Sequence, residues 1–115
     1  MQKDDLIRMR HMLDAARNAL TFVAGRSRSD LARDPMLMFA LVRAVEVIGE
    51  AASKVSRDCQ ERFSEISWPK IIGMRHRLIH GYYDINLDIL WETTTVALPP
   101  LVQALEGIIA SESAT

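Results

Sequence analysis

The side chains best suited to chemistry gather in the stretch from Ser67 to Tyr83. Its ionisable side chains other than tyrosine are Lys70, Arg75, His76, Arg77 and His80, and it contains no Asp or Glu. A local field of one sign that also holds two imidazoles suits an anionic ligand such as a phosphodiester. The same charges could instead be a solvated helix end, because cations are favoured in the last turn of a helix. Charge alone does not separate these two interpretations.

A metal site is one possible use of the two histidines. His76 and His80 are four residues apart, which on a continuous helix puts both imidazoles on one face. However, no further His or Cys lies nearby in the sequence, and Arg75 and Arg77 would repel a cation. The chain also has no glycine-rich phosphate loop and no serine in a nucleophile elbow. We therefore predict no metal site and no cofactor.

Arg75 and His80 form the pair with the clearest chemical use. Arginine suits bidentate contact with phosphate, and histidine can act as base or acid near neutral pH. Together they suffice for metal-independent RNA cleavage, in which a 2′-hydroxyl loses its proton and attacks the adjacent phosphorus. Five residues apart on a helix, they do not share a face. They can converge if the chain bends at Gly81, or where two copies meet about a two-fold axis.

Two glutamates and two tryptophans each allow two interpretations. Glu46 and Glu50 are one turn apart on a predicted helix. Either both face solvent, or one of them turns inward to hold a basic residue of the central stretch. Trp68 and Trp91 are expected in the core or at an interface, with a base-stacking platform as the alternative. His11 is expected to be exposed.

Hydrophobic periodicity predicts an all-α, up-and-down bundle of four to five helices. The first helix should run from about Asp4 to Ala24 and end at Gly25. Two heptad-spaced series mark its apolar seam, Leu6, Leu13, Leu20 and Met9, Ala16, Val23. This seam could pack inside the bundle or against a second subunit.

The bounds of the remaining helices are predicted from capping residues and from the glycines and prolines that interrupt helices. Ser29 or Asp30 could cap a short turn. A second long helix should run from Pro35 to about Asp58, and a third from Trp68 to Ile79 or His80, before a loop at Gly81. The last should begin near Leu87, capped by Asn86 or Asp84, and Pro99-Pro100 must kink or split it.

Length and composition bound the remaining possibilities. The chain has 115 residues and a net charge of −1, which fits a single domain over residues 1–115 and excludes nucleic-acid or membrane binding through bulk charge. Cys59 has no partner for an internal disulfide and is expected at a helix C-terminus. We find no signal peptide, and the apolar run 36–42 is too short to span a bilayer. We therefore expect a cytoplasmic protein without a membrane partner.

The central stretch also resembles a known motif. Arg75-x4-His80-x-Tyr82 is similar to the R-x4-H-x-Y motif of the HepT-like toxins, a branch of the HEPN ribonuclease superfamily. The runs Val47–Ala52 and Ile66–Arg75 resemble the family's sequence in the same order and spacing. The chain departs from the pattern at His76, where many members have Asn. That histidine could support the reaction or lie at the surface.

The resemblance implies a fold, a reaction and partners. Members are HEPN-like helical bundles that form homodimers, with the catalytic Arg and His of both subunits, here Arg75 and His80, facing a shared cleft. They are metal-independent endoribonucleases acting on cellular RNA, paired as toxins with a minimal nucleotidyltransferase antitoxin. By position, the tyrosine to which that antitoxin transfers AMP is Tyr82. We assign supporting roles to His76, Glu46 and Glu50.

Two other functions remain open on the sequence alone. The chain could be a non-catalytic subunit of a two-chain nucleotidyltransferase that binds a nucleotide or the partner. It could also be a bundle whose motif residues serve a purely structural interface. RNA cleavage in EDTA that depends on Arg75 and His80 would separate the enzyme from both.

Overall fold

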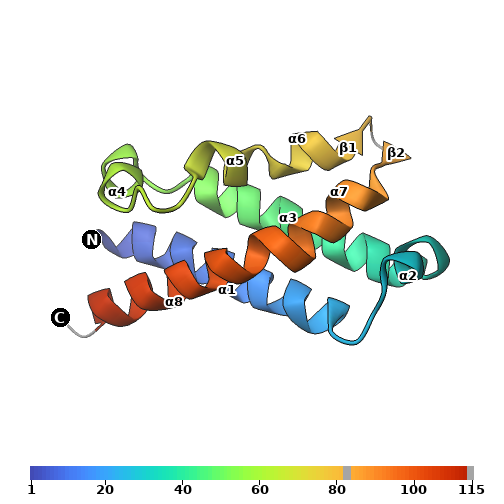
Figure 1. Ribbon diagram of the computed structural model, residues 1–115. Coiled ribbons are helices and arrows are strands. Elements are labelled where there is room, and N and C mark those ends of the chain that lie inside the picture. Colours follow the sequence, from blue (N-terminus) through green and yellow to red (C-terminus); the bar gives the residue numbers. More distant parts are fainter. Residues whose placement is uncertain (82–83, 114–115) are drawn as a thin grey trace.

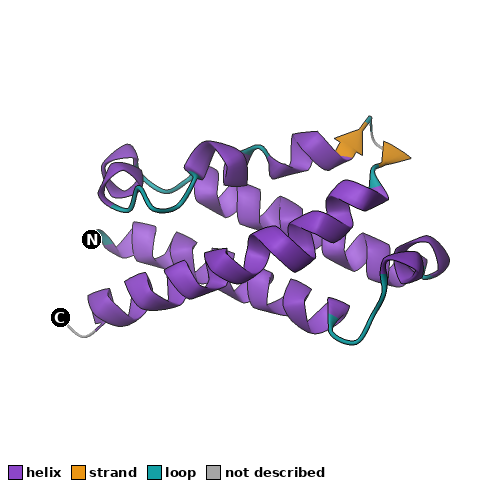
Figure 2. Ribbon diagram, viewed as in Figure 1, coloured by secondary structure: helices purple, strands orange, loops and turns teal. Residues whose placement is uncertain are grey.

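Four helical rods lie antiparallel in the computed structural model, which describes residues 1–81 and 84–113. The first rod is α1, the second α3, the third α5 with α6, and the fourth α7 continuing into α8 (Figures 1 and 2). The all-α, up-and-down bundle is therefore confirmed. The helices are α1 (Lys3–Val23), α2 (Arg28–Arg33), α3 (Pro35–Ser53), α4 (Arg57–Arg62), α5 (Trp68–Ile72), α6 (Met74–Leu78), α7 (Leu87–Glu92), the π-helix η1 (Thr93–Ala97) and α8 (Leu98–Ser113).

The apolar seam of α1 is used inside the chain. α1 packs chiefly against α3 and α8. Met9, Leu13, Ala16 and Val23 are buried there, and Leu20 is partly buried against the same cluster. α1 ends where predicted, because Gly25 follows it with a φ of 73°, a conformation that glycine adopts without strain.

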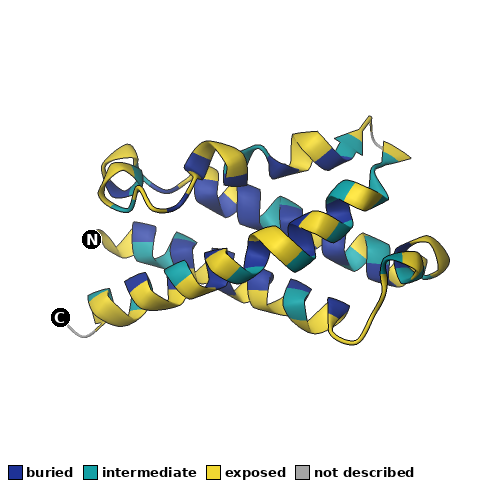
Figure 3. Ribbon diagram, viewed as in Figure 1, coloured by how far each residue is buried: buried dark blue, intermediate teal, exposed yellow. Residues whose placement is uncertain are grey.

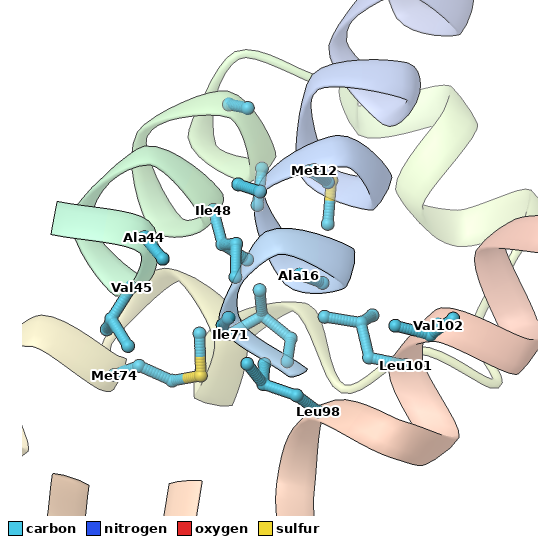
Figure 4. Close-up of a cluster of buried hydrophobic side chains, with 14 of the residues drawn as sticks. Met12, Ala16, Ala44, Val45, Ile48, Ile71, Met74, Leu98, Leu101 and Val102 are labelled. Atoms are coloured by element: carbon cyan, nitrogen blue, oxygen red, sulfur yellow. The ribbon is translucent and has the colours of Figure 1, made fainter. Parts of the chain in front are cut away.

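One hydrophobic cluster fills the space between the rods. The buried faces of all four rods point toward it (Figure 3). In the close-up, Met12 and Ile48 enter the cluster from one side, and Leu98 and Met74 enter it from the other (Figure 4). Among the described residues, no buried side-chain nitrogen or oxygen lacks a hydrogen-bond partner. No described helix is long and apolar enough to cross a membrane.

The second long helix ends earlier than predicted. α3 stops at Ser53, and Ser56 then caps the separate helix α4 by accepting a hydrogen bond from the Cys59 amide at 3.2 Å. Asp5 fixes this break, since its carboxylate accepts from the Ser56 amide at 2.8 Å and from the Ser56 hydroxyl at 2.6 Å. Cys59 is consequently buried in the first turn of α4 rather than at a helix C-terminus.

The third helix is also interrupted. Gly73 separates α5 from α6, at a point where a Cβ would lie only 3.1 Å from the Pro69 carbonyl oxygen. α6 ends at Leu78, three residues before Gly81. The predicted loop contains instead an antiparallel pair of two-residue strands, β1 (Ile79–His80) and β2 (Asp84–Ile85).

The last rod runs from α7 through the π-helix η1 into α8 without an interruption of the helix. The Asn86 side chain caps α7 by accepting from the Ile89 amide at 3.0 Å, which confirms one of the two predicted caps. Pro99 and Pro100 lack amide donors, and the π-helix η1 ends at Ala97, two residues before Pro99. The Thr94 hydroxyl donates to the Leu90 carbonyl at 3.0 Å within the same rod. The short helix α2 is capped at Ser27, not at Ser29 or Asp30.

Candidate active site

A glycine lets the third rod lie close to α3. Gly49 is buried on α3, and a Cβ built on it would lie 3.3 Å from the Ile72 carbonyl oxygen and 3.4 Å from that of Ile71. A Cβ at this position would require the backbone of α5 to move by a few tenths of an ångström. This close approach brings the start of α6 within reach of the side chains of α3.

Arg75 and Glu46 meet across this contact. The Arg75 Nε atom donates to Glu46 Oε2 at 3.1 Å, and the two side chains are 47% and 31% exposed. Glu46 is thus the inward-turned carboxylate, while Glu50 is 72% exposed and pairs with Lys54 at 3.6 Å. Within residues 1–81 and 84–113, the two Nη atoms of Arg75 make no hydrogen bond. Glu46 therefore orients the guanidinium and leaves its outer edge open to a ligand.

The Arg75–Glu46 pair lies in an open depression between α3 and α6. Its volume is about 490 Å³. The lining residues are Arg43, Glu46, Gly49, Glu50, Ser53, Ile72, Arg75 and His76. Sequence reasoning missed Arg43, although it lies three residues before Glu46 and seven before Glu50, the spacing of one helical face. An arginine held by a carboxylate, with a second arginine and a histidine in the same lining, suits an oxyanion of phosphate.

His80 does not line this depression. It lies in β1, exposed, with Asp84 as its strand partner. The expectation that His76 and His80 share a helical face is wrong, because α6 ends between them at Leu78. Tyr82 falls outside the described residues. Of the predicted site, the structure therefore gathers Arg75, His76, Glu46 and Glu50, and places His80 in the adjoining hairpin.

The remaining candidates lie away from the depression. Trp68 is buried and its indole nitrogen donates to the Phe63 carbonyl at 3.1 Å, while Trp91 is partly buried against the core. Trp68 therefore has the predicted core position, and Trp91 packs against the core. His11 is exposed on α1, as expected. Within the described part of the chain, no three His, Cys, Asp or Glu side chains are arranged to hold a metal ion.

Comparison with known proteins decides the family. The family model described as "Ribonuclease HepT-like" matches residues 12–108. The chain belongs to the HepT-like ribonuclease family. The match includes α3, α5, α6 and the hairpin, so the depression and His80 lie within the part shared with the family. The resemblance noted in the sequence is confirmed.

Curated relatives agree with this assignment. The chain is 36% identical over 104 residues to "Putative RNase TTE0752" of Caldanaerobacter subterraneus subsp. tengcongensis, covering 90% of this chain and 93% of the relative. It is 36% identical over 79 residues to "Probable ribonuclease HepT" of Thermococcus cleftensis, covering 69% and 72%. A third relative, "Putative RNase MJ1380" of Methanocaldococcus jannaschii, is 28% identical over 95 residues, covering 83% and 87%. No solved structure matches the chain.

Proposed function

We propose that this HepT-like chain is a metal-independent endoribonuclease in which Arg75 and His80 carry the chemistry, and that residues 1–115 act as one domain. The observation that carries the proposal is the orientation of Arg75. Its Nε atom is bound to Glu46 at 3.1 Å, and its outer edge faces an open depression. An arginine held this way can present two parallel N–H donors to a phosphate.

The reaction uses the 2′-hydroxyl of the RNA itself. A histidine removes its proton, the oxygen attacks the adjacent phosphorus, and the bond to the 5′-oxygen breaks as that oxygen receives a proton. The products are a 2′,3′-cyclic phosphate and a 5′-hydroxyl. Arg75 stabilises the negative charge on the phosphoryl oxygens. His76, which shares the depression with Arg75, contributes a further donor to the substrate.

One catalytic histidine per chain supplies either the base or the acid. We propose that a homodimer supplies both, with His80 of each subunit facing a common cleft. The exposure of His80 and the openness of the Arg75 depression support this arrangement, because a second copy can reach both. Two copies of Arg75 would then bind the same strand of RNA.

The place of Tyr82 in the sequence motif suggests how the ribonuclease activity is regulated. We propose that the chain is the toxin of a toxin–antitoxin pair, and that a minimal nucleotidyltransferase antitoxin transfers AMP to the Tyr82 hydroxyl. The neighbours Gly81 and Asp84 are exposed, which supports access by such an enzyme. The added phosphate and nucleotide would block the cleft by charge and bulk.

The test is RNA cleavage in EDTA by the purified chain. We expect cleavage by the wild type and its loss in Arg75→Ala and His80→Ala. The matched controls are His11→Ala, an exposed histidine on α1, and Arg57→Ala, an arginine whose side chain is 91% exposed on α4. Both controls should cleave like the wild type. Intact RNA in the presence of folded wild-type protein would refute the enzyme and leave a binding subunit of a nucleotidyltransferase.

A further inference from the structure

A second hollow lies on the other side of the third rod. It separates α5 and α6 from η1 and α8 and has a volume of about 330 Å³. Its lining residues are Glu65, Ile66, Ser67, Lys70, Ile71, Met74, Arg77, Ala97, Pro100, Leu101 and Ala104. None of these residues lines the Arg75 depression. We call this hollow the α5–α8 groove.

Two cations without partners line the α5–α8 groove. Lys70 and Arg77 are exposed, and neither makes an ion pair or a hydrogen bond through its side chain with any other described residue. Most arginines elsewhere do: Arg17 and Arg28, for example, each reach a carboxylate at 2.7 Å. Glu65 is the one acidic residue in the groove lining. The groove therefore has a net positive charge that the described chain leaves unneutralised.

The α5–α6 rod is a ridge with cations on both flanks. Arg75 and His76 line the depression on its α3 side, and Arg77 lines the groove on its α8 side. These three residues are consecutive in a five-residue helix, so the distance between the two flanks is about the width of one helix. A polyanion bound at Arg75 can cross this ridge and reach Arg77 and Lys70.

The floor of the groove is apolar and has no side chains that could recognise particular bases. Ile66, Ile71, Met74 and Leu101 are core side chains that are each at least 92% buried, and Ile71, Met74 and Leu101 appear in the core close-up (Figure 4). The rim near α8 is apolar as well, with Ala97 and Pro100 exposed. These apolar side chains offer no hydrogen bonds to base edges, so the groove would bind a strand through phosphate contacts of its cations.

We propose that Lys70 and Arg77 form a second phosphate-binding subsite, which holds the single-stranded RNA beyond the bond that is cut. This proposal rests on the proposed ribonuclease function. An acidic segment of a partner protein is the rival occupant. RNA is favoured because basic side chains stand on both flanks of the ridge, Arg77 with Lys70 in the groove and Arg75 in the depression, and a nucleic-acid strand carries evenly repeated charge along that path.

The test measures RNA binding without cleavage. The probe is a single-stranded 2′-O-methyl RNA of about 12 nucleotides, which lacks the attacking hydroxyl. The variant is Lys70→Ala with Arg77→Ala. The control is Lys3→Ala with Arg57→Ala, which removes the same charge at exposed positions of α1 and α4. Both double variants are checked for an unchanged melting temperature, and affinity is measured across a range of salt concentrations.

Two lost phosphate contacts should flatten the slope of log affinity against log salt by about 1.4, at roughly 0.7 per contact for a single strand. By that slope, affinity at roughly 0.1 M salt should fall about 25-fold relative to the wild type. The control pair should match the wild type. A groove variant with the wild-type slope would overturn the proposal, as would one that binds RNA normally and loses a protein partner. Because the probe cannot be cut, wild-type binding without cleavage of ordinary RNA would refute the ribonuclease function alone.

Discussion

The contact between Gly49 and α5 predicts opposite effects for the same substitution at two helix positions. Gly49→Ala would place a Cβ 3.3 Å from the Ile72 carbonyl oxygen, whereas Gly107 on α8 has nothing within 4 Å of such a Cβ. Replacing glycine by alanine inside a helix stabilises by about 0.8–1.0 kcal/mol when nothing is disturbed. Gly107→Ala should therefore raise the free energy of unfolding by about that amount.

Gly49→Ala also changes the free energy of unfolding through packing. Forcing a methyl group into a packed contact with backbone costs about 1–3 kcal/mol, so the net change should lie between about zero and 2 kcal/mol destabilising. The propensity term is common to both variants, and their difference isolates the packing term, about 1–3 kcal/mol. Urea denaturation with an unchanged m value measures it.

Gly49→Ala should also reduce RNA cleavage, because displacement of α5 and α6 moves Arg75 relative to Glu46. The Gly107→Ala variant serves as the matched control and should cleave RNA like the wild type. Equal stabilisation by both alanines would show that α3 and α5 do not approach each other as closely as described, and would refute the argument for how Arg75 is positioned.

Three further predictions concern buried polar groups. Asp5→Ala should lower the free energy of unfolding by about 1.5–3 kcal/mol, because it leaves the Ser56 amide and hydroxyl unpaired; a change within error in urea denaturation would contradict this. Burial, and then the nearby Asp5 charge, raise the pKa of the Cys59 thiol. Because the Cys59 thiol ionises at a lower pH in the unfolded chain than in the folded chain, the free energy of unfolding should fall as the pH rises above roughly 8.5. Cys59→Ala should remove that dependence on pH; a wild-type plot of unfolding free energy against pH as flat as that of the variant would count against it. Thr94→Val should cost about 1 kcal/mol in thermal unfolding through the lost bond to the Leu90 carbonyl, and an unchanged midpoint would mean that water replaces the hydroxyl.

Local patterns predicted the long helices. The heptad series of α1 identified Met9, Leu13, Ala16 and Val23, which are buried in the core. For Glu46 and Glu50, the sequence left open whether both face solvent or one holds a basic residue of the central stretch. That Glu46 meets Arg75 depends on where Gly49 lets α5 approach, which is a tertiary contact without a local signal.

The errors arose where distant residues decide the local structure. α3 ends at Ser53 because Asp5 binds Ser56 across 51 residues of sequence, and helix propensity does not register that bond. α6 ends at Leu78 rather than near Gly81 because Ile79 and His80 pair with the strand after the turn. As a result, the helical geometry assumed for His80 was wrong, and its place in β1, outside the lining of the Arg75 depression, could not be predicted.

The most direct test of the proposed chemistry is the identity of the RNA ends that the chain produces in EDTA, determined by mass spectrometry. Attack by the 2′-hydroxyl predicts a 2′,3′-cyclic phosphate on one fragment and a 5′-hydroxyl on the other, with neither formed by Arg75→Ala or His80→Ala. Fragments with 5′-phosphate and 3′-hydroxyl ends would mean that water attacks the phosphorus, and would contradict the roles proposed for both residues.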